Sequence, residues 1–92
     1  MSEPVFAISV AADMAAMEIQ NLRVYERRGL VAPGRTAGGT RRYSSDDVDR
    51  LRRIGDLLAA GLNLAGVARV LALEDELALV REENVGLRRR KR

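Results

Sequence analysis

Two adjacent glycines near the middle of the chain constrain its fold most strongly. Gly38 and Gly39 stand in the stretch RTAGGTRRYS, residues 35–44, with one arginine before them and two after. Adjacent glycines favour a tight turn between two extended arms, because glycine adopts backbone angles that other residues avoid. The stretch therefore predicts a β-hairpin. A hairpin does not need these arginines in order to form. We therefore expect either a hairpin that binds phosphate or an ordinary hairpin whose basic edge is solvated.

Two short helices are predicted before the hairpin. Ser9 is the expected N-cap of a helix over residues 10–16. The apolar spacing within residues 19–28 predicts a second helix, which Gly29 ends. Two short helices joined within a few residues are the outline of a helix-turn-helix.

Two further helices are predicted after the hairpin. Ser44 and Asp47 have the spacing of a capping box, which predicts a third helix over residues 45–60. Asn63 is the expected N-cap of a fourth helix over residues 64–71. The residues that we expect the third helix to bury are Val48, Leu51, Ile54 or Gly55, and Leu58.

The C-terminal segment has the repeat of a coiled coil. Its seam residues are spaced four, three, four and three apart, and they are Leu73, Leu77, Val80, Asn84 and Leu87. So narrow an apolar stripe is marginal alone, and we expect it to pair with a second copy or else to fold back on the domain. The basic end, residues 88–92, is interpreted as a phosphate contact, a helix cap or a solubilising end.

Composition limits the class of protein. The 92 residues suit one domain with an appended helix, and only 3% of them are aromatic, so the core must be aliphatic. The chain has no cysteine and no histidine, which excludes thiolate metal sites, cysteine nucleophiles and imidazole bases. We therefore expect no enzyme, no metal and no cofactor. Without a long apolar run or signal peptide, the expected location is the cytoplasm.

Charge is unevenly distributed along the chain. The net charge is +3, but residues 23–42 alone carry +5, because they hold six arginines and one acid, Glu26. Residues 1–22 carry −3 and residues 74–87 carry −4. The basic block contains the predicted hairpin, which favours a nucleic-acid partner.

These residues together resemble the MerR family of bacterial transcription regulators. The likeness rests on LRVYERRGLV at residues 22–31, the following Pro33, the hairpin and Asp47-Val48, and it covers about residues 6–72. The hairpin and the start of the chain resemble the branch of heat-shock repressors related to HspR. The resemblance implies a mainly α winged helix-turn-helix over 1–72, with a two-stranded hairpin wing, and a coiled-coil dimerisation helix with a basic tail over 73–92.

The resemblance also implies roles for individual residues. The second helix enters the major groove, where the expected base-contacting residues are Gln20, Asn21 and Arg23. The expected phosphate-contacting residues are Tyr25, Arg27, Arg28, Arg35, Arg41, Arg42, Tyr43 and Asn63. Tyr25 has an alternative role as a core aromatic, and Arg28 as a helix cap. Glu26 is expected to pair with an arginine rather than touch DNA.

The resemblance implies a homodimeric, sequence-specific regulator of an inverted-repeat operator, acting as a repressor and associated with the nucleoid when bound. A DnaK-type chaperone is the protein partner that this branch suggests. Two alternatives stay open, an architectural nucleic-acid binder with little sequence preference and a dimerising antagonist of a longer relative. The turn departs from the family, since Glu18 is a poor N-cap and Ala16 suits the turn only with a negative φ.

Overall fold

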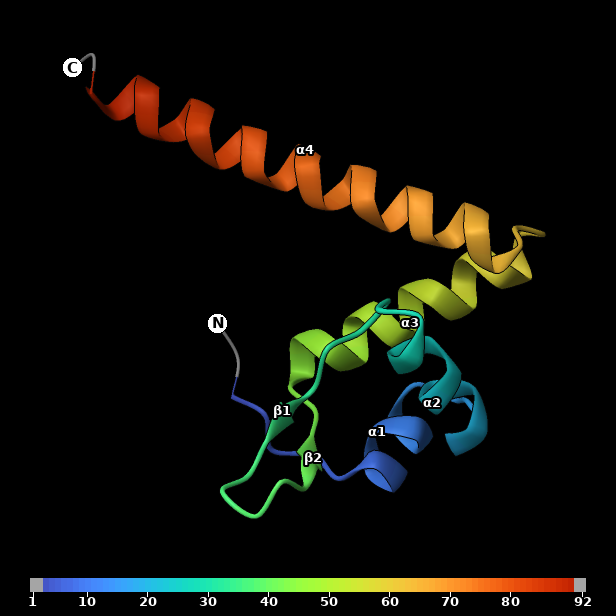
Figure 1. Ribbon diagram of the computed structural model, residues 1–92. Coiled ribbons are helices and arrows are strands. Elements are labelled where there is room, and N and C mark those ends of the chain that lie inside the picture. Colours follow the sequence, from blue (N-terminus) through green and yellow to red (C-terminus); the bar gives the residue numbers. More distant parts are fainter. Residues whose placement is uncertain (1–2, 91–92) are drawn as a thin grey trace. The chain divides into compact units, whose positions relative to one another are not determined.

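The computed structural model describes residues 3–90, and in that range it is mainly helical with one β-hairpin (Figure 1). The elements are α1 (Ile8–Met14), α2 (Ile19–Arg27), β1 (Gly34–Arg35), β2 (Arg41–Arg42), α3 (Ser45–Ala59) and α4 (Leu64–Arg90). The chain divides after Gly61 into two compact units, of which the first holds α1 to α3 and the hairpin and the second holds α4. The predicted fold class is therefore confirmed.

α1 begins two residues earlier than predicted. Its N-cap is Ala7, which makes no side-chain capping bond, so the prediction of Ser9 as N-cap is wrong. The reason lies in the residues before it: the amides of Val5 and Phe6 donate to the Tyr43 carbonyl at 3.0 and 2.9 Å, and the Tyr43 amide donates back to Phe6 at 2.8 Å. The chain enters α1 where this pairing with the hairpin ends, so a tertiary contact overrides capping preference.

α2 ends as the sequence predicts. Gly29 has a φ of +75°, its amide donates to Glu26, and the Leu30 amide donates to the Tyr25 carbonyl, both at 2.9 Å. These two bonds form a Schellman motif, which closes the helix and turns the chain inward. Leu30 and Val31 are buried directly after it.

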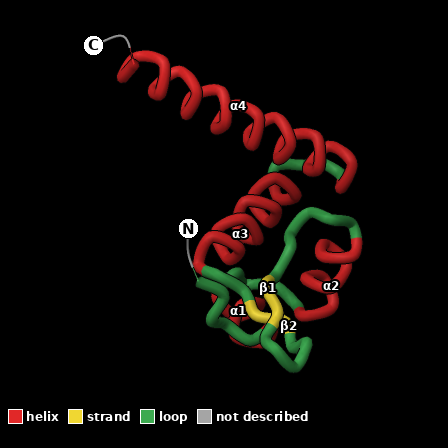
Figure 2. Tube along the Cα trace, turned by 60° about the vertical axis from the view of Figure 1, so that its left-hand side comes forward, coloured by secondary structure: helices red, strands yellow, loops and turns green. Residues whose placement is uncertain are grey.

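The hairpin pairs β1 with β2 in antiparallel register, with Gly34 opposite Arg42 and Arg35 opposite Arg41. Its loop projects beyond the helices of the first unit in both views (Figures 1 and 2). Only one glycine of the predicted pair uses the left-handed region: Gly39 has a φ of +83°, whereas Gly38 has no positive φ.

α3 starts with the predicted capping box. The Asp47 amide donates to Ser44 Oγ at 3.0 Å, and the Ser44 amide donates to Asp47 Oδ2 at 2.9 Å. The buried side chains are Val48, Leu51, Ile54 and Leu57. The prediction is wrong at its last position, since Leu57 is buried and Leu58 only partly so. Residues spaced by three form a row inclined to the helix axis, and burial follows that row.

α4 is one continuous helix, although the sequence predicts a break after residue 71. Asn63 caps it as predicted, accepting from the Gly66 amide at 2.9 Å. The expected boundary between residues 72 and 73 falls inside this helix, so the division into 1–72 and 73–92 stays a prediction. The side chains of the basic end, residues 88–92, lie outside the described residues.

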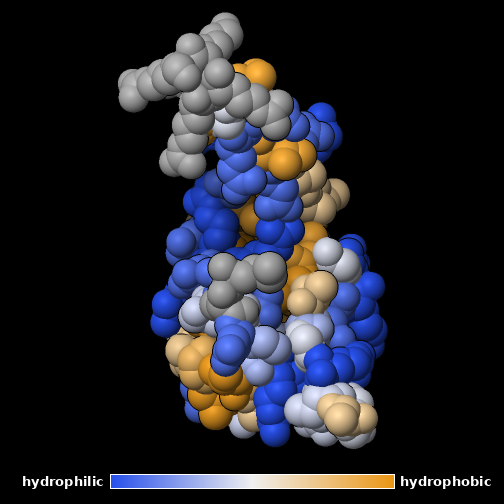
Figure 3. All heavy atoms as spheres, turned by 90° about the vertical axis from the view of Figure 1, so that its left-hand side faces the viewer, coloured by the Kyte–Doolittle hydropathy of each residue, from blue (hydrophilic) through white to orange (hydrophobic). Residues whose placement is uncertain are grey.

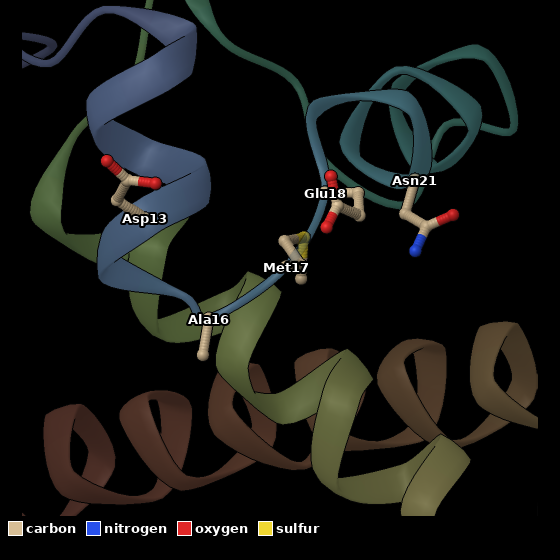
Figure 4. Close-up of a pocket in the computed structure, with 5 residues that line it drawn as sticks. All are labelled: Asp13, Ala16, Met17, Glu18 and Asn21. Carbon is tan, nitrogen blue, oxygen red and sulfur yellow. The ribbon is translucent and has the colours of Figure 1, made fainter.

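The turn between α1 and α2 carries a backbone conformation that is costly for its residue. Ala16 has a φ of +54°, and it is the only non-glycine residue with a positive φ in the described part of the chain (Figure 4). A left-handed backbone brings Cβ close to the following carbonyl oxygen, at a cost of roughly 1–2 kcal/mol. Ala16, at which the sequence departs from the family, therefore has a strained backbone.

We expect Ala16→Gly to raise the free energy of unfolding by about 1 kcal/mol, because glycine has no Cβ to clash and loses only part of that gain to chain entropy. Urea unfolding at a fixed protein concentration measures the change. Ala15→Gly is the matched control, since Ala15 has a φ of −91° and should lose stability. Equal losses in both variants would show that Ala16 is not strained.

Candidate nucleic-acid interface

The carboxylate of Glu26, on α2, gathers side chains from both arms of the hairpin. Arg41 Nε donates to Glu26 Oε1 at 2.8 Å, and Arg35 Nη2 lies 3.7 Å from the same oxygen. The Glu26 side chain is only 13% exposed, so this pairing is partly shielded from water. The prediction that Glu26 pairs with a nearby arginine is confirmed. As the sole acid of the basic block, Glu26 was the sequence signal for this contact.

Tyr43, which follows β2 directly, completes the same network. It is fully buried, and its hydroxyl donates to Glu26 Oε2 at 3.3 Å. Burial, followed by the charge and hydrogen bond of Glu26, raises the pKa of Tyr43 to about 12. In this structure the Tyr43 hydroxyl joins the end of the hairpin to α2 through Glu26, and the phosphate contact expected of Tyr43 stays a prediction.

A basic hollow of about 370 Å³ lies between α2 and the hairpin, and the start of α1 also lines it. Four of the residues that line it are arginines, one from α2 and three from the hairpin, namely Arg23, Arg35, Arg41 and Arg42. The Arg35 guanidinium also donates to the Gly39 carbonyl at 3.1 Å, which holds it against the hairpin loop. Guanidinium groups that converge on an open hollow suit a phosphate group, because each offers several donors and a permanent charge.

The expected base-contacting residues all lie exposed on α2, but they do not form one cluster. Arg23 lines the basic hollow. Asn21 lines a different hollow at the turn between α1 and α2. At about 100° per residue, Gln20 lies between them on the exposed side of the helix. Arg23 is therefore placed to act with the hairpin, which its assignment as a base reader did not anticipate.

The remaining predicted contacts are divided among different environments. Arg27 and Arg28 are exposed at the end of α2, where Arg28 is also the C-cap residue. Tyr25 is 8% exposed, which favours its alternative role in the core. The Asn63 side chain caps α4, and its predicted phosphate contact remains untested.

One contact that the sequence did not indicate fixes the helix-turn-helix to α3. Arg52 donates from Nε and Nη2 to the Met14 carbonyl, at 3.1 and 2.9 Å. Nothing in the local sequence pairs two residues so far apart. Among the described residues, no group of three or more histidine, cysteine or acidic side chains is placed to hold a metal ion. Within that same range, no helix is long and apolar enough to span a membrane.

We expect Glu26→Ala to lower the free energy of unfolding by about 2 kcal/mol, because it removes charged hydrogen bonds and leaves the buried Tyr43 hydroxyl without its acceptor. Glu26→Gln keeps an acceptor but not the charge, so its loss should be smaller. Urea unfolding gives both values.

The matched control is Glu76→Gln, on an exposed part of α4, which should change stability by less than about 0.5 kcal/mol. If all three substitutions have the same small effect, the Glu26 network does not stabilise the fold.

Comparisons with known proteins agree with this geometry. Residues 6–74 match the MerR HTH family regulatory proteins. The heat shock protein HspR of Streptomyces coelicolor is 49% identical over 76 residues, which cover 82% of this chain and 50% of that protein. The HTH-type transcriptional regulator GlnR of Bacillus anthracis is 41% identical over 85 residues, covering 89% of this chain and 66% of that protein.

The fold also matches a solved structure. HiNmlR, a MerR family regulator lacking the sensor domain and bound to promoter DNA, superposes with a TM-score of 0.67 at 23% identity, covering 96% of this chain and 71% of that one. The chain spans about half to two-thirds of the length of the two curated relatives. The matched segment includes the whole helix-turn-helix and hairpin. The chain belongs to the MerR family of helix-turn-helix regulatory proteins, not to a family of enzymes.

Proposed function

We propose that the chain is a sequence-specific DNA-binding transcriptional regulator that acts as a homodimer on an inverted-repeat operator and represses by occupying the promoter. The basic hollow between α2 and the hairpin is the observation that carries this proposal. It combines the second helix of a helix-turn-helix with a hairpin whose arginines are already positioned. The likeness to HiNmlR, whose structure includes promoter DNA, supports it.

The interface follows from the way helix-turn-helix proteins bind. The second helix lies in the major groove and its first turns reach base edges. With α2 in the groove, a hairpin fixed beside it lies against the neighbouring backbone, and the four arginines of the hollow would receive a phosphate there. Gln20, at the centre of the exposed side of α2, is then the residue best placed to read a base, by bidentate bonding to adenine.

The two apolar faces of α4 support the homodimer. Val67 and Leu71 are buried, whereas Leu73, Leu77 and Val80 are between 46% and 49% exposed. At about 100° per residue, the exposed stripe lies about 140° around the helix from the buried pair. The stripe therefore does not continue the buried face, and a fold-back along one side of the helix leaves it uncovered. Figure 3 shows orange, apolar side chains between blue ones on α4, at the top of the view.

The pairing surface has the composition of a short coiled coil. Asn84, the fourth of the five seam residues, would fix the register at some cost in stability. Repression and the DnaK-type chaperone partner both come from the resemblance of the sequence to heat-shock repressors, and both stay predictions. Two copies joined through α4 would present two α2 helices to the two halves of an inverted repeat.

A binding titration tests the DNA-reading role. The full chain should prefer an inverted-repeat duplex of the kind bound by heat-shock repressors over a scrambled duplex by more than about 10³-fold, at low and at near-physiological salt. Gln20→Ala should reduce that preference by about 5- to 150-fold, because it removes one base contact. Arg42→Ala should weaken binding to both duplexes alike and lower the salt slope by about one.

Equal binding of the wild-type chain to both duplexes, fading together with salt, would instead indicate an architectural protein. Absence of binding to either would favour the dimerising antagonist. Arg42→Ala serves as the control for Gln20→Ala, since both variants lose one exposed or partly exposed polar side chain from the same unit.

A second pair of variants tests the homodimer. Leu77→Asp should raise the dimer dissociation constant at least about 100-fold, because each dimer loses two buried leucines worth about 1.5–3 kcal/mol each. Analytical ultracentrifugation over a range of concentrations measures it. Leu79→Asp is the matched control, since Leu79 is 58% exposed but lies off the stripe. Equal effects of the two substitutions, or a wild-type monomer, would contradict this arrangement of the dimer.

A further inference from the structure

A second hollow, of about 360 Å³, lies at the turn that joins α1 to α2. It is lined by Asp13, Ala16, Met17, Glu18 and Asn21 (Figure 4). Its charged groups are acidic, whereas the hollow on the other edge of α2 is lined by arginines. An acidic surface beside a DNA-binding helix lowers affinity for every phosphate backbone, so it needs a compensating role if the surface faces the duplex.

Glu18 is held rigidly at the start of α2 while its carboxylate takes no part in the capping of the helix. The residue is the N-cap, with φ −74° and ψ 144°, and its side chain makes no capping bond. Its carbonyl accepts from the amides of Asn21 and Leu22, at 3.1 and 3.2 Å. The backbone of Glu18 is thus fixed, and its exposed carboxylate is available to a ligand.

Glu18 and Asn21 project from the same side of α2. They are three residues apart, a spacing that makes two side chains neighbours on a helix surface. Figure 4 shows both at the beginning of α2, just beyond the loop that carries Ala16 and Met17. In helix-turn-helix proteins these first residues of the second helix are the ones that reach base edges. Glu18 therefore lies at the same end of α2 from which Asn21 is expected to contact a base.

The chemistry of a carboxylate in the major groove is selective. An ionised carboxylate only accepts hydrogen bonds, and of the base edges cytosine offers an amino group with no competing acceptor. Guanine and thymine present acceptors there, which repel it. We propose that Glu18 is a specificity-determining residue that accepts a hydrogen bond from the N4 amino group of one cytosine in each half-site. This inference rests on the proposed DNA-reading function of α2.

The alternative is that Glu18 acts only through its charge. In that case its removal would strengthen binding to all duplexes by one common factor and leave sequence preference unchanged. Direct readout predicts a different pattern, in which the preference for cytosine is lost at one position per half-site and kept elsewhere. Asp13 separates the two effects, because it lines the same hollow and carries the same charge but belongs to α1.

The experiment selects duplexes from a random-sequence pool with the full wild-type chain, and then titrates the best duplex and its single base-pair replacements. The titrations are repeated with Glu18→Gln, Glu18→Ala and Asp13→Asn, after circular dichroism shows that each variant keeps its helical content. At one position the wild type should favour C·G over the other pairs by about 5- to 150-fold, the range of one discriminating contact. Both Glu18 variants should lose that factor, and Asp13→Asn should keep it.

Two results would overturn the proposal. One is a cytosine preference that Glu18→Ala retains, with binding to all duplexes strengthened by one common factor, which would show a charge effect alone. The other is a cytosine preference that Asp13→Asn removes to the same extent as the Glu18 variants, which would show that the preference does not come from a contact of Glu18 itself. A wild-type chain that selects no sequence at all would contradict both the proposed function and this inference. Sequence selection that is lost in Gln20→Ala but kept in the Glu18 variants would contradict this inference alone.

Discussion

The arrangement of the first unit depends on the contacts that the Glu26 carboxylate makes with the hairpin and with Tyr43. The block around it carries six arginines, and their mutual repulsion opposes bringing the hairpin close to α2. Glu26 offsets this repulsion locally. Its carboxylate accepts hydrogen bonds from Arg41 and from the buried Tyr43, and it lies near the guanidinium of Arg35. The hairpin is thereby joined to α2 through polar contacts at both of its arms. A wing held in this way keeps its guanidinium groups at a fixed place beside the helix.

The two edges of α2 carry charges of opposite sign. Arg23 faces the hollow shared with the hairpin, while Glu18 faces the acidic hollow at the turn. An asymmetric helix of this kind does not enter a groove equally well in either orientation, since one edge attracts phosphate and the other repels it. In the proposed function, the positive edge would supply affinity, and the negative edge would supply discrimination by making the wrong bases unfavourable. In the proposed function, register in the groove follows from both edges together.

The sequence predicted those features that local chemistry determines. The capping box of Ser44, the Asn63 cap and the Gly29 stop depend on residues within a few positions, and all three occur in the structure. The start of α1 and the burial of Tyr43 depend on pairing between segments far apart in the chain, which periodicity does not report. The continuity of α4 was missed because two apolar faces of one helix look like two helices. Within the site, the arginines could be predicted, but the division between Arg23 and Asn21 could not.

The two faces of α4 also connect stability with recognition. A helix of 27 residues that leaves six large apolar side chains at least 46% exposed gains little from packing within its own chain. A core almost without aromatic residues has little stability in reserve to compensate. Association through the exposed stripe would therefore stabilise the helix and place two α2 helices on one duplex in the same step. Because DNA would bind the dimer more tightly than the monomer, linkage requires that an operator also strengthens dimerisation by the same factor.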